Sequence, residues 1–219
     1  MNRAQLEQYF SAERLAPYFN RYPGNDPKAQ YLYEANILVS EALYTPLSIL
    51  EVALRNKISN ELTRKYNRPD WYAEWYKHPV MHHAWHDVNA TINRLHKDKM
   101  PVVPERIVAS LMFGFWTALF NDRYDRELWG NLRFVFSNMP KNIRQSRNIS
   151  TPLNDIRRTL RNRVYHNEPI IFNTATVNNH YNNILNLLTW MGVDLRAYND
   201  ARDRFPAILI QVNNRLKQL

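Results

Sequence analysis

Apolar residues recur at the spacing of an α-helix along almost the whole 219-residue chain. Positions three and four residues apart repeat on one face, and no sustained alternation of apolar and polar residues appears between turn residues. The first pattern is typical of helices that bury one stripe, whereas alternation would be typical of strands. The sequence therefore predicts an all-α fold, and we expect residues 1–219 to form a single domain.

Prolines and polar turns predict where the first long helices begin and end. Residues 21–27 form a breaker segment ahead of a helix over about residues 28–43. Thr45-Pro46 predicts the start of another helix that runs to about residue 66, because Thr is a suitable N-cap and Pro fits the first turn. We expect this second helix to face the core with one apolar stripe, which consists of Leu47, Leu50, Leu54, Ile58 and Leu62.

The same reasoning predicts five further helices, over about residues 80–97, 107–120, 151–164, 176–191 and 206–219. Thr151-Pro152 repeats the Thr-Pro start signal. Residues 107–120 are the most apolar run, and we interpret them as the central buried helix. This run is too short to cross roughly 30 Å of hydrocarbon, so no membrane span is expected. Residues 138–150 are mostly polar and basic and predict an exposed connection.

Composition removes several classes of protein and narrows the partners. The chain contains no Cys, which excludes disulfide scaffolds, thiol nucleophiles and cysteine-based zinc sites. The first eight residues lack the apolar core of a secretory signal, so we expect a cytoplasmic protein. Lys and Arg outnumber Asp and Glu by 29 to 20, and the resulting charge of +9 attracts polyanions such as RNA. A cationic surface that serves only solubility is the alternative.

Residues 161–169, with the sequence Arg-Asn-Arg-Val-Tyr-His-Asn-Glu-Pro, carry the chemistry of interest. They bring a permanent cation (Arg161), an amide (Asn162) and an imidazole (His166) close to a helix end. Cleavage of RNA by its own 2′-hydroxyl needs a group that takes the hydroxyl proton, one that protonates the leaving oxygen, and a cation for the phosphate. His and Arg supply these roles without a metal or another cofactor.

This segment resembles the Arg-Asn-x-x-x-His motif of HEPN-superfamily ribonucleases, and its longer form is similar to that of Abi-like abortive-infection proteins of bacteria. Leu50-Glu51 with Leu54-Arg55-Asn56 resembles an upstream motif of the same proteins, and residues 113–116, Phe-Gly-Phe-Trp, resemble their central helix. The resemblance covers about residues 35–187. It implies a helical bundle of HEPN type, a homodimer with both motifs near the interface, metal-independent endoribonuclease activity in many members, and a role in phage defence or as a toxin, with a neutralising antitoxin or regulatory RNA as a further partner.

The spacing of the motif raises a geometric question. On an ideal helix Arg161 and His166 point about 140° apart, so either the helix ends or bends before Pro169 or a second chain completes the site. Glu51 lies within the angular range of the apolar stripe, and a carboxylate there needs a partner. Arg55 is one turn away and Arg161 is the candidate from another helix, while a carboxylate that reaches solvent is the alternative.

The sequence thus assigns catalysis to Arg161, Asn162 and His166, support of that site to Glu51 and Arg55, and RNA binding to Arg157, Arg158 and Arg163. The alternative is a non-catalytic RNA-binding or regulatory module, in which Arg161 and His166 only cap a helix end. A third reading, metal hydrolysis around His82 and His86, lacks an evident third ligand, so no metal is expected. Trp71, Tyr72, Trp75 and Tyr76 favour core packing over base stacking.

Overall fold

The computed structural model describes residues 2–194 and 203–219. Every regular element in this part of the chain is a helix, so the all-α prediction is confirmed. The α-helices are α1 (Arg3–Phe10), α2 (Ala12–Phe19), α3 (Asp26–Tyr66), α4 (His82–Lys97), α5 (Pro104–Ser110), α6 (Phe113–Ala118), α7 (Gly130–Leu132), α8 (Arg147–Asp155), α9 (Asn162–Tyr165), α10 (Thr174–Trp190) and α12 (Phe205–Gln218). Shorter turns are the 3-10 helices η1 (Trp75–Lys77), η2 (Asp122–Tyr124), η4 (Arg133–Phe136) and η5 (Lys141–Ile143), and the π-helices η3 (Asp125–Trp129) and η6 (Ile156–Arg161).

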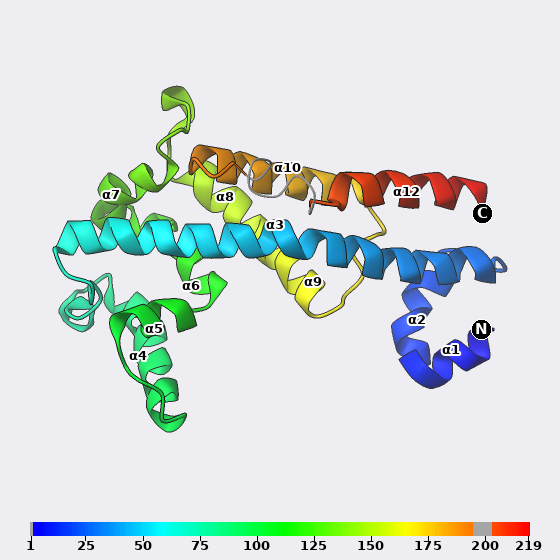
Figure 1. Ribbon diagram of the computed structural model, residues 1–219, viewed down its shortest axis with the longest axis horizontal. Coiled ribbons are helices and arrows are strands. Elements are labelled where there is room, and N and C mark those ends of the chain that lie inside the picture. The colour runs from blue at the N-terminus through cyan, green and yellow to red at the C-terminus, as the bar shows by residue number, and fades with distance from the viewer. Residues whose placement is uncertain (1, 195–202) are drawn as a thin grey trace.

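Helix α3 is the axis of the molecule (Figure 1). Its 41 residues extend about 60 Å, and α10 and α12 follow one another along one side of it. Helices α4, α5 and α6 form a lobe beside one end of α3, and α1 and α2 form a second lobe beside the other end (Figure 1). The motif helix α9 packs on α3 between these two lobes.

The prediction of two helices separated at Thr45-Pro46 is wrong, because α3 runs through Pro46 without a break. A proline inside a helix removes one backbone hydrogen bond and costs about 3 kcal/mol. However, Leu43 and Leu47 on either side of Pro46 are buried, and each contributes roughly 1.5–3 kcal/mol when it stays in the core. The apolar positions before and after the proline face one core, so their combined burial outweighs the lost hydrogen bond.

The interpretation of residues 107–120 as the central buried helix is also wrong. The segment is divided into α5 and α6 by Leu111 and Met112, which have extended backbones. Its aromatic residues are nevertheless buried, as expected of core positions. The central position belongs to α3, the longest helix among the described residues. By length and composition alone α3 is long and apolar enough to cross a membrane. The core helices of soluble proteins can have the same length and composition.

Helices α8 and α9 are joined by the π-helix η6 into one continuous helical segment. The helix predicted from Thr151 begins earlier, at Arg147, with Pro152 in its interior, and it ends at Tyr165 close to the predicted limit. Ile149 and Ser150 are buried, so the predicted exposed connection is shorter than residues 138–150. The buried apolar positions of this segment are separated by four, three, four and four residues, the spacing of one helical face, and they are Ile149, Leu153, Ile156, Leu160 and Val164.

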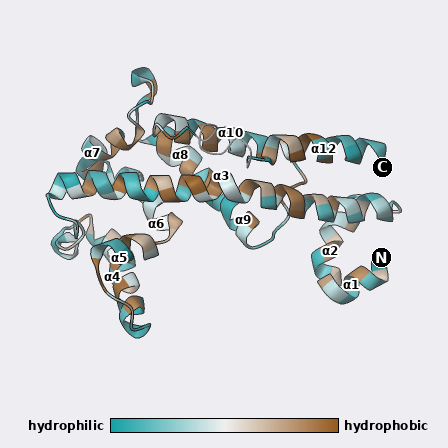
Figure 2. Cartoon of the chain, viewed as in Figure 1, coloured by the Kyte–Doolittle hydropathy of each residue, from teal (hydrophilic) through white to brown (hydrophobic). Residues whose placement is uncertain are grey.

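The apolar positions of these helices meet in one core that runs along α3. In Figure 2 hydrophobic and hydrophilic residues follow one another along α3, α10 and α12, the pattern of helices that bury one face. The predicted stripe from Leu47 to Leu62 is entirely buried. Trp71, Tyr72 and Trp75 are buried as well, whereas Tyr76 is exposed and packs beside Trp85.

Leu50 tests the stripe directly. Because Leu50 is fully buried on α3, Leu50→Ala is expected to lower the free energy of unfolding by about 2–5 kcal/mol, measured by chemical denaturation. Val52 on the same helix is exposed, so Val52→Ala serves as the control and is expected to change stability by less than about 0.5 kcal/mol. Equal losses in the two variants would contradict the assignment of α3 as the buried axis.

Candidate functional site

The candidate site forms where the end of η6, the helix α9 and the middle of α3 meet. Arg161 is the last residue of η6, and a terminal nitrogen of its guanidinium lies 3.4 Å from a carboxylate oxygen of Glu51 on α3. The side chain of Arg161 is 20% exposed and that of Glu51 is 26% exposed, so this pair is partly shielded from water. The structure therefore contains the contact that the sequence proposed between these two helices.

A pair of tyrosines extends this contact along the surface, and the sequence analysis did not identify it. The guanidinium carbon of Arg161 lies 4.2 Å from the ring centre of Tyr165, a cation–π arrangement. Tyr165 in turn stacks on Tyr44 of α3, with ring centres 5.6 Å apart. Burial, followed by the negative charge of Glu51, raises the pKa of Tyr165. Arg161 is thus fixed by a carboxylate and an aromatic ring, and its Nε atom is buried without a hydrogen-bond partner among the described residues.

His166 lies at the end of α9 and its side chain is exposed. Two backbone hydrogen bonds close the helix around it, from Asn167 to Val164 at 3.2 Å and from Glu168 to Arg163 at 2.8 Å. Asn167 has a φ of 54°, the left-handed conformation that this type of helix end requires and that Asn tolerates. The His-Asn-Glu-Pro part of the motif is therefore a helix stop that presents the imidazole at the surface.

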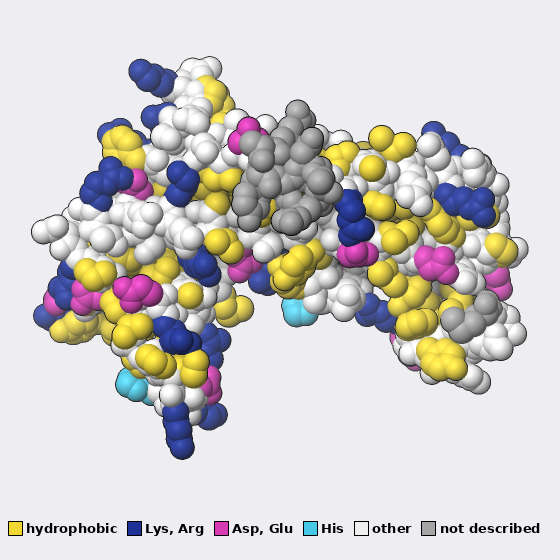
Figure 3. Space-filling model, viewed as in Figure 1, with side chains coloured by type: hydrophobic (Ala, Val, Ile, Leu, Met, Phe, Trp, Pro, Cys, Tyr) yellow, Lys and Arg dark blue, Asp and Glu magenta, His cyan; other side chains and the backbone are white. Residues whose placement is uncertain are grey.

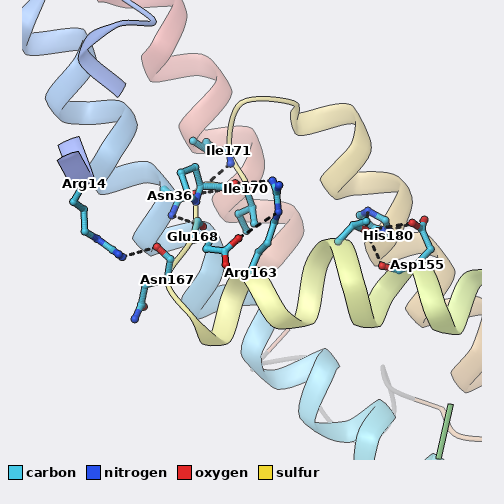
Figure 4. A network of polar contacts seen from close by, with 11 residues as sticks. Arg14, Asn36, Asp155, Arg163, Asn167, Glu168, Ile170, Ile171 and His180 are labelled. Atoms are coloured by element: carbon cyan, nitrogen blue, oxygen red, sulfur yellow. Dashed lines mark hydrogen bonds and ion pairs between the residues drawn. The ribbon is translucent and has the colours of Figure 1, made fainter. Parts of the chain in front are cut away.

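The segment that follows is held by one buried side chain, Asn36 of α3 (Figure 4). The side-chain oxygen of Asn36 accepts hydrogen bonds from the backbone nitrogens of Ile170 at 2.7 Å and Ile171 at 3.2 Å, and its amide donates to the carbonyl of Glu168 at 3.3 Å. Arg14 of α2 donates to the carbonyl of Asn167. The sequence analysis did not identify Asn36. Its position as a lone amide within an apolar run was a signal that could have identified it, because a buried amide needs hydrogen-bond partners.

The geometric question posed by the motif has a partial answer. The helix does end before Pro169, as the first alternative expected, but it stays helical through Tyr165. Within the residues described, Arg161 and His166 make no direct hydrogen bond or ring contact with each other. Asn162 starts α9, and its carbonyl accepts the backbone N–H of His166 at 2.9 Å. The site of a single chain therefore consists of a fixed cation and an exposed imidazole on neighbouring turns.

The other basic residues predicted to bind RNA lie on three different faces of the continuous segment formed by η6 and α9. Arg157 is half-buried and faces α4 and α6, whereas Arg158 is exposed beside Thr159 on another face. Arg163 lies 3.6 Å from the carboxylate of Glu168 and donates to the carbonyl of Pro169 at 3.2 Å. These three residues do not form one cluster.

Arg55 does not support the site in the way the sequence suggested. Its guanidinium donates to the carbonyl of Ala109 on α5 at 3.4 Å and to the side chain of Asn56 at 3.2 Å, and no ion pair joins it to Glu51 in the part of the chain that the structure describes. Of the two arginines considered for Glu51, the one from the other helix is its partner. Arg55 finds its acceptor on α5 instead, although it lies one turn from Glu51 on the same helix.

A buried histidine supports the motif helix from behind. His180 of α10 is almost fully buried, with its Nε2 atom 3.0 Å from the hydroxyl of Thr159 and its Nδ1 atom 3.5 Å from the carboxylate of Asp155 (Figure 4). Burial lowers the pKa of His180, and the charge of Asp155 opposes this shift. These contacts tie the π-helix η6 to α10.

The histidines of α4 show the geometry of a close pair. The Nε2 atoms of His82 and His86 lie 3.1 Å apart, and the ring of His83 is 4.8 Å from that of His82. No group of three or more metal-ligating side chains is found among the residues that the structure describes.

Comparison with known proteins adds no relative to these observations: no family model, no curated protein and no solved structure matches the chain. The site therefore has to be judged from its own chemistry. A guanidinium held in place by Glu51 and Tyr165 offers a fixed positive charge, and the imidazole of His166 offers a proton donor or acceptor in contact with solvent. These are groups suited to an anionic substrate such as a phosphodiester.

Asn36 tests how the end of the motif is held. Asn36→Ala leaves the backbone nitrogens of Ile170 and Ile171 buried without an acceptor, so we expect a loss of about 1–3 kcal/mol in the free energy of unfolding. Hydrogen exchange at these two amides is expected to become faster than in the parent protein. Asn60→Ala, an exposed change on the same helix, is the control and is expected to leave both measurements unchanged. Unaltered exchange at Ile170 and Ile171 would show that Asn36 does not hold this segment.

Proposed function

We propose that this protein is a metal-independent endoribonuclease of HEPN type, similar to Abi-like proteins, that cleaves RNA by attack of its own 2′-hydroxyl. The observation that carries the proposal is the arrangement of the motif: Arg161 is fixed by Glu51 and Tyr165, and His166 is exposed one turn later at the end of α9. The family resemblance of residues 161–169 supplies the reaction, and the geometry is compatible with it.

In the proposed reaction the 2′-oxygen attacks the adjacent phosphorus and the bond from phosphorus to the 5′-oxygen breaks. The products are a 2′,3′-cyclic phosphate and a free 5′-hydroxyl. One proton leaves the 2′-hydroxyl and one joins the 5′-oxygen, and His166 acts as the base or the acid for one of these transfers. Arg161 stabilises the negative charge that gathers on the phosphate oxygens, and Asn162 positions the start of α9.

A homodimer belongs to the proposal, because a single chain presents one imidazole where the reaction needs two proton transfers. A second copy that brings its own His166 and Arg161 to the same phosphodiester would provide the missing groups. Arg157 and Arg158 of η6 and Arg163 of α9 lie on different faces, so each would contact RNA phosphates singly and not as part of one patch. The formal charge of +9 supports RNA as the partner.

One observation favours the second candidate, a non-catalytic RNA-binding or regulatory module. The guanidinium of Arg161 already has a carboxylate partner in Glu51, as an arginine with a purely structural role would. In that case His166 would be only an exposed helix-terminal residue. The two candidates share the basic surface and differ in whether bound RNA is cut.

The biological setting proposed here rests on the family resemblance. It comprises a cytoplasmic protein that acts in phage defence or as a toxin, restrained by an antitoxin or a regulatory RNA. The substrate class and the reaction are the parts of the proposal that the chemistry of the site supports.

Cleavage of labelled RNA by the purified chain tests the catalytic proposal. We expect cleavage that persists in excess chelator and yields cyclic phosphate ends, and no cleavage of DNA, which lacks the attacking hydroxyl. Arg161→Ala and His166→Ala are each expected to slow cleavage by about 10²-fold or more. Arg147→Ala, at an exposed position at the start of α8, is the matched control and is expected to retain full activity.

Three other results would decide against it. RNA that is shifted in a gel but stays intact supports the non-catalytic module. Activity abolished by chelator contradicts the metal-independent mechanism. Cleavage that survives both Arg161→Ala and His166→Ala removes these residues from the reaction.

Glu51 tests how Arg161 is positioned. Glu51→Gln removes the charge that holds the guanidinium, so we expect kcat to fall on the order of ten-fold while the affinity for RNA changes little. Single-turnover cleavage and RNA binding to the same preparation separate these two quantities. A variant with unchanged kcat would show that the contact between Glu51 and Arg161 has no part in the reaction.

A further inference from the structure

A hollow of about 460 Å³ lies between the lobe of α4 to α6 and the π-helix η6, which precedes the motif helix. Figure 3 shows Lys and Arg side chains on this lobe, with Asp and Glu side chains among them. The volume is within the range of sites for small organic ligands. Three elements and one connection line the hollow, through Asp87, Ala90, Thr91, Arg94, Leu111, Met112, Gly114, Phe115 and Arg157.

Two arginines from different elements face this hollow. Arg94 of α4 is exposed and donates to the carbonyl of Ser110 at 2.8 Å, and Arg157 of η6 is half-buried and donates to the side chain of Asn154 at 3.5 Å. Neither guanidinium forms an ion pair with a carboxylate among the described residues, although Asp87 also lines the hollow. The Nε atom of Arg157 is buried without a hydrogen-bond partner in that same part of the chain.

A half-buried cation without a carboxylate partner has lost part of its hydration, and an anion that enters the hollow would compensate for this loss. Burial, with the neighbouring charge of Arg158 as a second cause, lowers the pKa of Arg157. Desolvation of a cation produces a shift in this direction, and no carboxylate in the described part of the chain pairs with Arg157 to oppose it. The two guanidinium groups therefore favour a ligand that carries a phosphate or another compact anion.

The rest of the wall is apolar and suits the body of such a ligand. Phe115 and Leu111 are buried and form part of the wall, while Met112 is 69% exposed. Gly114 lies against Arg157: a Cβ built there would be 3.6 Å from a terminal nitrogen of that arginine and would occupy space beside it. A flat apolar group placed against Met112 and Phe115 would bring an attached phosphate toward Arg94 and Arg157.

We propose that this hollow is a nucleotide-binding site, in which Arg94 and Arg157 bind the phosphate and Met112 and Phe115 contact the base. The proposal deepens the proposed function, since RNA as the ligand rests on it, and it adds a subsite that the motif does not contain. Arg157 and Arg161 lie on the same π-helix, four residues apart. A nucleotide of an RNA chain in this site would therefore lie close to the fixed cation of the motif.

Binding to the full chain tests this site without cleavage. All proteins carry His166→Ala, and the probes are fluorescent adenosine monophosphate and a short fluorescent RNA, measured by anisotropy. Arg94→Gln, Arg157→Gln and Gly114→Val are each expected to weaken binding about ten-fold, since the first two remove a phosphate contact and the third fills the hollow. Arg147→Gln removes an equal charge from the start of α8 and is expected to bind as the parent does. Thermal melting confirms that each variant is folded.

The outcomes separate the sources of the ligand. Weaker binding of both probes assigns the site to free nucleotides and RNA alike, and weaker binding of RNA alone assigns it to the RNA chain. Equal affinities in Arg94→Gln, Arg157→Gln and Arg147→Gln overturn the proposal. It is also overturned if inorganic phosphate displaces adenosine monophosphate as well as unlabelled adenosine monophosphate does, because the apolar wall would then contribute nothing. Cleavage by the unmodified chain is a separate measurement, so failure of the catalytic proposal leaves this result interpretable.

Discussion

The burial of one face of α3 is the constraint on which the rest of the structure depends. Asn36 and Glu51 both lie on this helix, about 22 Å apart if the helix is straight. Asn36 holds the backbone after α9, and Glu51 contacts Arg161 at the end of η6. A break at Pro46, which lies between them, would remove the fixed separation of these two contacts. The burial of Leu43 and Leu47 against the core therefore positions the motif as well as stabilising the fold.

Two local features, the π-helix η6 and the left-handed residue Asn167, lie at opposite ends of the motif helix α9. The π-helix η6 joins α8 to α9 with Ile156 and Leu160 buried, while Arg157 and Arg161 are only partly buried. The left-handed Asn167 ends α9 and leaves the imidazole of His166 exposed. His180 ties the first feature to α10, and Asn36 ties the second to α3. Both ends of a short helix are thus fixed by buried polar groups.

The surroundings of the motif explain why charge and shape have to be considered together. The net positive charge attracts anions to the whole surface. In the described part of the chain, however, only some arginines lack an ion pair with a carboxylate. Arg161 and Arg163 have acidic neighbours, whereas Arg157 is half-buried beside an apolar hollow without an ion pair there. Glu51 holds the guanidinium of Arg161 in one orientation, whereas no carboxylate among the described residues holds that of Arg157. The same residue type therefore takes different roles along a single helix.

The sequence by itself determined the helical class, the buried stripe from Leu47 to Leu62, the end of α9 near Pro169 and the approximate bounds of α4, α10 and α12. These features follow from periodicity and from the local preferences of Asn and Pro, which act within one or two turns. It also suggested the contact between Glu51 and Arg161, because a carboxylate within an apolar stripe needs a partner. Only the tertiary structure decided that both Thr-Pro pairs lie inside helices, that residues 107–120 divide into two, and that Asn36, Tyr44 and the hollow beside Arg157 surround the motif. Those outcomes depend on the burial of side chains against residues distant in the chain. The free energy of this burial exceeds the local cost of a proline, and it cannot be predicted from the spacing of nearby residues.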